Sequence, residues 1–485
     1  MTFNSIEFLI FFPIVLLLYF VLPRVMKWPM LLVASYYFYM CYSPSLVVLI
    51  LGTTLVSWIS SRLMERTESR AARRALLTLT LVVSLGVLFF YKYFDFLSAS
   101  FSSVMGLFGF SSEPFLLKLA LPVGISFYTF QTLSYVIDVY RGKIKSESNF
   151  FFYALFVSFF PQLVAGPIER PDNLMPQLRV ANKWSDSDFV KGLKHMLVGF
   201  FKKICVADLV SVAVDSVYNS PEEAGTLGII LATVLFSVQI YCDFSGYTDI
   251  AIGCARMMGI RLMQNFNHPY MATTIKEFWS RWHLSLSTWF RDYLYIPLGG
   301  NRCKKWRHML NLFIVFLVSG LWHGAEWTFV VWGALHGVYQ IIGSLSAKPR
   351  RRLIEKLGFS EKSHGVVWTR RIITFVLVAV AWLVFRANNM GECITLFKNL
   401  FGGTGGGFLA TLEFMGLDLV GILIIAVSFI LLLFLDNLLI YGEGRDGSHL
   451  LVKNGAFIYI AWIILLCWLF LISNDMVSKF IYFQF

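Results

Sequence analysis

The run IEFLIFFPIVLLLYFVL, Ile6–Leu22, carries one charged residue, Glu7. A helix of about 20 apolar residues crosses the roughly 30 Å hydrocarbon core of a bilayer. Comparable apolar runs recur along the chain as far as Ile458–Leu471. The sequence therefore predicts an all-α, polytopic membrane protein with about eleven transmembrane helices.

The composition excludes a soluble protein. Of the 485 residues, 57% are hydrophobic and 14% are charged, a balance that a water-exposed surface does not tolerate. The net charge of +12 comes from Lys and Arg residues in short loops between the apolar runs. Such a distribution follows the rule that cytoplasmic loops are basic, and it argues against a nucleic-acid partner.

The same rule predicts the orientation. No Lys or Arg precedes Arg24, so the first span should leave its N-terminus outside the cytoplasm, and alternation puts the C-terminus outside as well. We expect one integral domain over residues 1–485. Its predicted parts are N-terminal helices (1–114), a catalytic core (115–346), C-terminal helices (347–473) and an extracytoplasmic tail (474–485).

Two apolar runs contain polar residues that should face a protein interior, because polar groups are costly in lipid. In the first run these are Ser126, Thr129, Gln131, Ser134 and Asp138, and in the second they are Cys242, Asp243, Ser245, Thr248 and Asp249. Between the runs, VAGPIERPDN (Val164–Asn173) breaks helix with glycine and proline. Both a re-entrant turn and an ordinary loop fit that segment.

The seven cysteines are scattered, without a C-x-x-C pair or metal-ligand spacing. We therefore expect no disulfide framework, no metal site and no cofactor.

A first candidate histidine, His283, lies in an amphipathic segment. Thr274 and Glu277 form a capping-box pattern that predicts a helix start, and Pro297 ends the element. The pattern predicts one helix at the cytoplasmic interface, with His283 at the border of its apolar stripe.

A second candidate, His323, lies in LVSGLWHGAEW (Leu317–Trp327). Basic residues flank its hairpin on both sides, so both ends should be cytoplasmic and His323 should lie near the apex. About 15 helical residues from His308 place it roughly 22 Å above the inner boundary. A neutral imidazole there can accept a hydroxyl proton, whereas we expect His336 to be structural.

FWSRWHLSLSTWFRDYLYIPLGGNR (Phe278–Arg302), SGLWHGAEW and CDFSGYTDIAIG (Cys242–Gly253) resemble motifs of the membrane-bound O-acyltransferase family. The similarity is to its bacterial branch of alginate and peptidoglycan O-acetyltransferases. The resemblance implies helices around a central tunnel in a bacterial plasma membrane, with His323 essential and His283 its partner. It also implies a cytoplasmic acyl thioester donor, an extracytoplasmic polysaccharide acceptor and a secreted or membrane-anchored esterase-like partner.

Further site residues follow from this interpretation. Acetyl-CoA is polyanionic and suits a basic cytoplasmic rim. We expect the donor to contact Arg281, Trp282, Arg291 and Tyr295, and we expect the tunnel to be lined by Asp243, Ser245 and Trp322.

The chain ends in SKFIYFQF, with Tyr482 among aromatic residues. An extended tail from Ser473 reaches about 30 Å, so Tyr482 could fold back to His323. The ending resembles the C-terminal tail of the small partner protein of teichoic acid D-alanylation, which implies an acyl-tyrosine intermediate. An interfacial aromatic anchor is the alternative.

The predicted activity is membrane O-acetylation of cell-surface or secreted polysaccharide. D-alanyl or other acyl transfer to teichoic acid remains an alternative, as does a transporter or flippase. The sequence shows no inverted repeat of the kind that many transporters contain. It leaves open the glycan, the choice between CoA and a carrier-protein donor, the partner and the oligomeric state.

Overall fold

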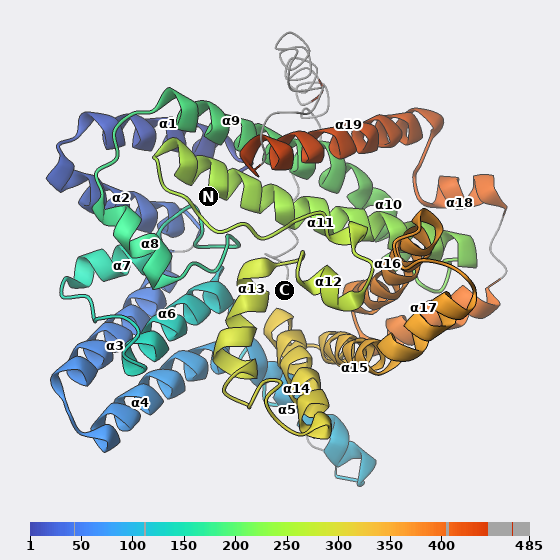
Figure 1. Ribbon diagram of the computed structural model, residues 1–485, viewed down its shortest axis with the longest axis horizontal. Coiled ribbons are helices and arrows are strands. Elements are labelled where there is room, and N and C mark those ends of the chain that lie inside the picture. The colour runs from blue at the N-terminus through green and yellow to red at the C-terminus, as the bar shows by residue number, and fades with distance from the viewer. Residues whose placement is uncertain (43, 111–112, 404–406, 445–467, 469–485) are drawn as a thin grey trace. The chain divides into compact units, whose positions relative to one another are not determined.

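The computed structural model describes residues 1–42, 44–110, 113–403, 407–444 and 468. Within these residues the chain is helical and contains no strand (Figure 1). The tail with Tyr482 lies outside them, as does the last predicted span except for Trp468.

The helices, in which η marks a short 3-10 or π segment, are α1 (Ile6–Val21), α2 (Arg24–Met40), η1 (Pro44–Leu46), α3 (Val47–Arg66), α4 (Arg70–Leu88), η2 (Phe89–Tyr93), α5 (Phe94–Leu107), α6 (Ile125–Tyr140), α7 (Phe150–Ser158), α8 (Pro171–Arg179), α9 (Asp186–Phe200), η3 (Phe201–Asp208), α10 (Leu209–Tyr218), α11 (Thr226–Met257), η4 (Pro269–Met271), α12 (Ile275–Trp279), α13 (Leu284–Phe290), η5 (Arg291–Tyr295), α14 (Lys305–His323), α15 (Trp327–Lys356), α16 (His364–Arg386), α17 (Met390–Gly402), α18 (Phe408–Phe414) and α19 (Leu419–Gly444).

Five of the described helical segments are long and apolar enough to cross a membrane, or six if α18 and α19, bent by 83°, form one span. The five are Pro44–Arg66, Arg70–Leu107, Thr226–Met257, Trp327–Lys356 and His364–Arg386. The prediction of an all-helical, polytopic protein is confirmed, and the number eleven stays a prediction. The first predicted span forms α1, whose 16 residues place it among the shorter apolar helices.

Packing divides the chain into two compact units. The first comprises Met1–Met196 with Ile250–Met263, and the second comprises Leu197–Asp249 with the described residues of 264–485. The prediction of one integral domain with a catalytic core at 115–346 stays a prediction.

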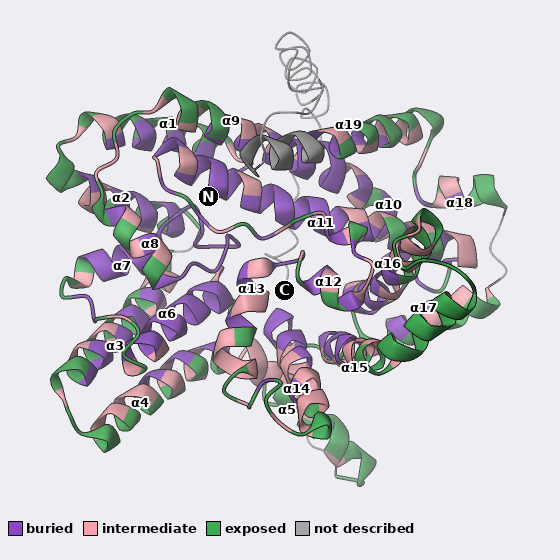
Figure 2. Ribbon diagram, in the orientation of Figure 1, coloured by how far each residue is buried: buried purple, intermediate pink, exposed green. Residues whose placement is uncertain are grey.

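In the first unit, α6 packs against both α3 and α4. The polar residues predicted to face an interior are buried on α6, which Figure 2 colours mostly as buried. Several of them have polar partners. Gln131 donates from Nε2 to the carbonyl of Phe156 at 2.7 Å, and Asp138 forms an ion pair with Lys143 at 3.1 Å. Burial with partners is what makes such groups tolerable away from water.

The glycine- and proline-rich segment of this unit is irregular yet buried. Residues 159–170 form no helix, and each of them is buried. The amide of Phe160 donates to Ser35 Oγ at 3.1 Å, and Glu169 accepts from Asn173 at 2.7 Å. Side chains thus replace some of the hydrogen bonds that a helix would have supplied.

The second unit is organised around a hairpin of α14 and α15. At their crossing, Gly320 and Gly333 bring the two backbones together. A Cβ at Gly320 would meet the carbonyl oxygen of Phe329 at 2.3 Å, and one at Gly333 would meet that of Phe316 at 2.5 Å. The predicted hairpin, with His323 at its apex, is confirmed.

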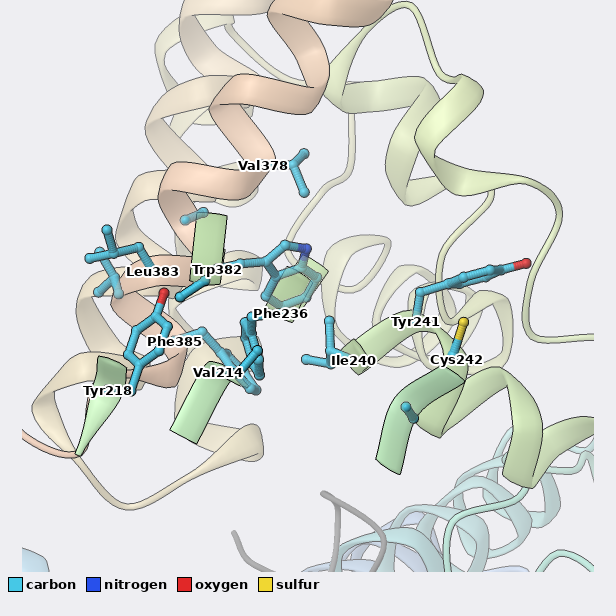
Figure 3. Close-up of a cluster of buried hydrophobic side chains, with 14 of the residues drawn as sticks. Val214, Tyr218, Phe236, Ile240, Tyr241, Cys242, Val378, Trp382, Leu383 and Phe385 are labelled. Carbon is cyan, nitrogen blue, oxygen red and sulfur yellow. The ribbon is translucent and has the colours of Figure 1, made fainter. Parts of the chain in front are cut away.

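A hydrophobic cluster holds the rest of this unit together. Side chains from α10, α11 and α16 face one another in Figure 3, among them Tyr218, Phe236 and Trp382. Burial of a large apolar side chain stabilises a fold by about 1.5–3 kcal/mol relative to exposure. The cluster therefore fixes α16 against α11 within this unit.

We predict that Gly333→Ala destabilises the protein by about 1–3 kcal/mol, because the added methyl must push two backbones apart. Thermal unfolding of the detergent-solubilised protein measures the effect. Gly343→Ala, on the same helix α15, is the matched control, since nothing lies within 4 Å of its added Cβ. Equal melting temperatures for the two variants would contradict the close crossing.

Candidate active site

The amphipathic segment around His283 is two short helices. The predicted start is confirmed, because Thr274 caps α12 by accepting from the Glu277 amide at 3.0 Å. The prediction of a single helix is wrong, since α12 ends at Trp279 and α13 begins at Leu284. A left-handed backbone at His283, with φ of 45°, produces the break.

A loop of the second unit receives the polar groups at this break. Asn265 accepts the amide of Leu284 on its carbonyl at 3.0 Å, and its side-chain oxygen accepts from Ser285 Oγ at 2.7 Å. Non-glycine residues seldom adopt positive φ, and the surrounding contacts must enforce it. The break turns His283 into the protein interior.

His283 is completely buried and surrounded by aromatic rings. Its ring centroid lies 4.7 Å from that of Phe244 and 5.9 Å from that of Trp322. His283 lies outside the apolar spans given above, and desolvation of its buried imidazole lowers its pKa to about 3. Its imidazole is therefore neutral near pH 7, when one ring nitrogen accepts and the other donates.

His323 ends α14, and its successor Gly324 takes the extended C-cap position. His323 is 6% exposed, and its imidazole packs edge-to-face against three rings. Centroid distances are 4.9 Å to Trp322, 5.0 Å to Trp332 and 5.6 Å to Phe385. Trp322 contacts both His323 and His283, so the structure brings the two predicted histidines to one indole.

The other predicted tunnel-lining residues lie on α11. Asp243 is 2% exposed and accepts from Lys203 Nζ at 2.8 Å, while Lys203 also pairs with Asp208 at 2.7 Å. Ser245 is buried close by in sequence. A buried ammonium between two carboxylates is costly to disrupt, so this cluster fixes η3 against α11. That they line a tunnel stays a prediction.

A large cavity occurs in the second unit, lined by residues of α12, α13, η5, α14, α15 and α16. Its volume is about 1820 Å³. No Asp or Glu is present among the described residues that line it. The lysine, arginine and histidine residues on its wall are Lys276, Arg291, His308, Arg350 and Arg370. The cavity therefore suits an anionic ligand with apolar parts.

Two of the four predicted donor-binding residues line this cavity. They are Arg291 and Tyr295, and the Tyr295 hydroxyl is hydrogen-bonded to Nδ1 of His308 at 3.0 Å. Arg281 is paired with Glu277 at 2.7 Å, Trp282 is buried, and neither is among the lining residues. Their role in binding a donor stays a prediction.

The cavity wall includes residues that sequence analysis did not select for the site. Arg350 and Arg370 come from α15 and α16, and Trp279 and Tyr339 form part of the wall. The run of basic residues near Arg350 was visible in the sequence, but it had the ordinary explanation of a cytoplasmic loop. Only packing distinguishes Arg350, which lines the cavity, from Arg351, which does not.

Comparison with known proteins identifies the family. The model of the membrane-bound O-acyltransferase family matches residues 143–383. The probable alginate O-acetylase AlgI of Pseudomonas aeruginosa is 39% identical over 406 residues, which cover 83% of this chain and 75% of that protein. The chain belongs to the membrane-bound O-acyltransferase family. The family assignment predicted from the motifs is confirmed, as is that of an integral membrane acyltransferase.

Two further relatives of this O-acyltransferase are named for other polymers. The peptidoglycan O-acetyltransferase of Helicobacter pylori is 34% identical over 426 residues, covering 81% of this chain and 78% of that protein. The teichoic acid D-alanyltransferase of Bacillus subtilis is 30% identical over 231 residues, covering 44% of this chain and 57% of that protein.

We predict that His323→Ala and His283→Asn both lower acyl transfer by about 10²–10⁴-fold, the usual contribution of a positioned acid or base. Asn tolerates the left-handed backbone, so His283→Asn removes the imidazole while keeping the break between α12 and α13. Thiol release from an acyl thioester in the presence of acceptor measures the activity. A fully active His283→Asn variant would reduce this residue to a structural role.

Proposed function

We propose that the protein is a membrane O-acetyltransferase that takes acetyl from cytoplasmic acetyl-CoA and delivers it to an extracytoplasmic polysaccharide. One observation carries the proposal: a single helix, α14, contributes His308 to the basic cavity and ends in His323. They lie fifteen positions apart on the helix, which is about 22 Å along the axis. The donor and the acceptor can thus meet at one imidazole from opposite sides of the membrane.

The cavity supports acetyl-CoA as the donor. Pockets of roughly 300–1,000 Å³ hold drug-sized ligands, and this one is larger, at about 1820 Å³. Arginines form bidentate bonds with phosphate, and the described wall includes Arg291, Arg350 and Arg370 but no carboxylate. Arg291 and Arg370 are oriented by ion pairs with Asp292 and Glu361, which do not line the cavity. Basic residues at the cytoplasmic ends of the spans also fit this orientation.

The reaction needs one proton transfer in each direction. His323 takes the proton of the acceptor hydroxyl, the hydroxyl oxygen bonds to the acetyl carbon, and the carbon–sulfur bond breaks. The proton then passes from the imidazolium to the departing thiolate. Neutral His283, which shares the Trp322 indole with His323, would assist at the thioester.

The first acceptor would be Tyr482. A thiol has a pKa near 8.5 and a phenol near 10, so an acetyl-tyrosine remains an activated ester for a sugar hydroxyl. An esterase-like partner, or the glycan itself, would take the acetyl from the tail. The relatives named for alginate and peptidoglycan acetylation support polysaccharide as the final acceptor class.

We expect Arg350→Gln to raise the KM for acetyl-CoA about three- to tenfold with little change in kcat, because an exposed phosphate contact contributes modestly. Arg351→Gln is the matched control, because the Arg351 guanidinium pairs with Glu355 at 2.8 Å and does not line the cavity. Steady-state thiol release at varied acetyl-CoA measures both variants. The same KM in the two would argue against a donor in this cavity.

Tyr482→Phe should abolish acetylation of the polysaccharide while the protein stays folded, because only the phenolic oxygen is lost. Ester content of isolated cell-surface polysaccharide measures the effect. Full activity of the variant would remove the tail from the mechanism without removing the acyltransferase.

D-alanyl transfer to teichoic acid is a second candidate, favoured by the similarity to teichoic acid D-alanyltransferase. Mass spectrometry of the C-terminal peptide after turnover distinguishes the two, because acetyl and alanyl adducts on Tyr482 differ in mass. A transporter would consume no thioester in the presence of acceptor.

A further inference from the structure

An aromatic partition separates the basic cavity from His323. One face of α15 carries Trp332, His336 and Tyr339 at helical spacing. Tyr339 lines the cavity, whereas His336, Trp332 and His323 do not. Trp332 and His336 are each 0% exposed. The order from the cavity inward is therefore Tyr339, His336, Trp332 and His323.

Centroid distances show that this partition is continuous. The imidazole of His336 lies 5.8 Å from Tyr339 and 4.9 Å from Trp332, and Trp332 lies 5.0 Å from His323. Trp279, which lines the cavity from α12, closes the side, with its ring 5.8 Å from Trp332. These ring contacts connect the cavity wall to His323, so they lie on a direct path from the cavity to the imidazole.

One hydrogen bond joins the two sides of the partition. Nε1 of Trp279 donates to Nδ1 of His336 at 3.1 Å. An indole nitrogen only donates, so Nδ1 of His336 accepts and its proton must be on Nε2. The bond links α12, at the cavity wall, to α15, the helix that contacts His323. It is thus placed to hold the partition closed.

Two buried donors inside the partition have no hydrogen-bond partner within the described part of the chain. They are Nε2 of His336 and Nε1 of Trp332. Buried donors without partners are uncommon and costly in folded proteins. A thioester carbonyl passing between these rings would supply the missing acceptor.

We propose that Trp279, His336 and Trp332 form a gate for the acetyl thioester, which the Trp279–His336 hydrogen bond keeps shut against water. The inference rests on the proposed function of the cavity and His323. His336 acts as a positioning residue, because it controls the indole of Trp279 and does not itself take part in the chemistry. When the gate leaks, water attacks the acetyl carbon, the carbon–sulfur bond breaks, and acetate and free CoA thiol leave.

The test measures two rates on the purified full chain in lipid nanodiscs. One is steady-state thiol release from acetyl-CoA without added polysaccharide, counted after the single turnover that acetylates Tyr482, and the other is transfer of labelled acetyl to alginate or peptidoglycan fragments. We expect His336→Leu and Trp279→Phe each to raise the ratio of hydrolysis to transfer about tenfold, which corresponds to about 1.4 kcal/mol. The ratio in the double variant should equal that in each single variant, because each single substitution already removes the Trp279–His336 hydrogen bond.

Two further variants control the test. His336→Asn keeps an acceptor near the position of Nδ1, so its ratio should stay within about twofold of the unmodified protein's, consistent with a retained hydrogen bond. Trp368→Phe, an exposed tryptophan on α16, should leave the ratio unchanged. If His336→Leu fails to fold, Trp279→Phe decides, because it keeps an aromatic ring in place.

The outcomes separate the two proposals. Normal transfer by the unmodified protein, with an unchanged ratio in Trp279→Phe, overturns the gate alone. A ratio in His336→Asn as high as in His336→Leu also overturns it. No transfer and no thiol release by the unmodified protein overturns the proposed function, and the gate with it.

Discussion

The close crossing of α14 and α15 is the constraint on which the candidate site depends. Gly320 and Gly333 let the two backbones touch, because any side chain at either position would collide with a carbonyl oxygen of the facing helix. This approach puts the end of α14 beside the first turns of α15 and sets His323 against Trp332. A wider crossing would separate the imidazole from the aromatic wall that keeps it from water.

Burial explains the chemistry available to the two histidines. Protonation of an imidazole costs more free energy where water is excluded, so buried His283 is neutral near pH 7. His283 reaches its buried position through a strained backbone, and strain of this kind costs about 1–3 kcal/mol. The asparagine at position 265 and the rings of Phe244 and Trp322 hold it there.

The cavity wall and the buried Lys203 cluster of this unit differ in how their charges are arranged. Around the cavity, cationic side chains face a common space without a carboxylate among the described lining residues, as a polyanionic donor requires. Inside, Lys203 is matched by Asp208 and Asp243, so the charges are internal to the fold. Arg291 and Arg370 pair with Asp292 and Glu361, carboxylates that do not line the cavity. A wall of guanidiniums without a lining carboxylate fits a site that binds a large anion while only a small acyl group moves inward.

The sequence alone determined the membrane class, the helical hairpin with His323 at its apex, the cap at Thr274 and the family, because apolar run length, basic loops and local motifs are properties of neighbouring residues. It also indicated Arg291 and Tyr295, which line the cavity. Tertiary structure alone decided that Arg350 faces the cavity while Arg351 does not, that Asn265 stabilises a helix break at His283, and that Trp279 bonds to His336, 57 residues away. Those features depend on contacts between distant segments, and no periodicity along a single helix encodes which side chain of another helix it will meet.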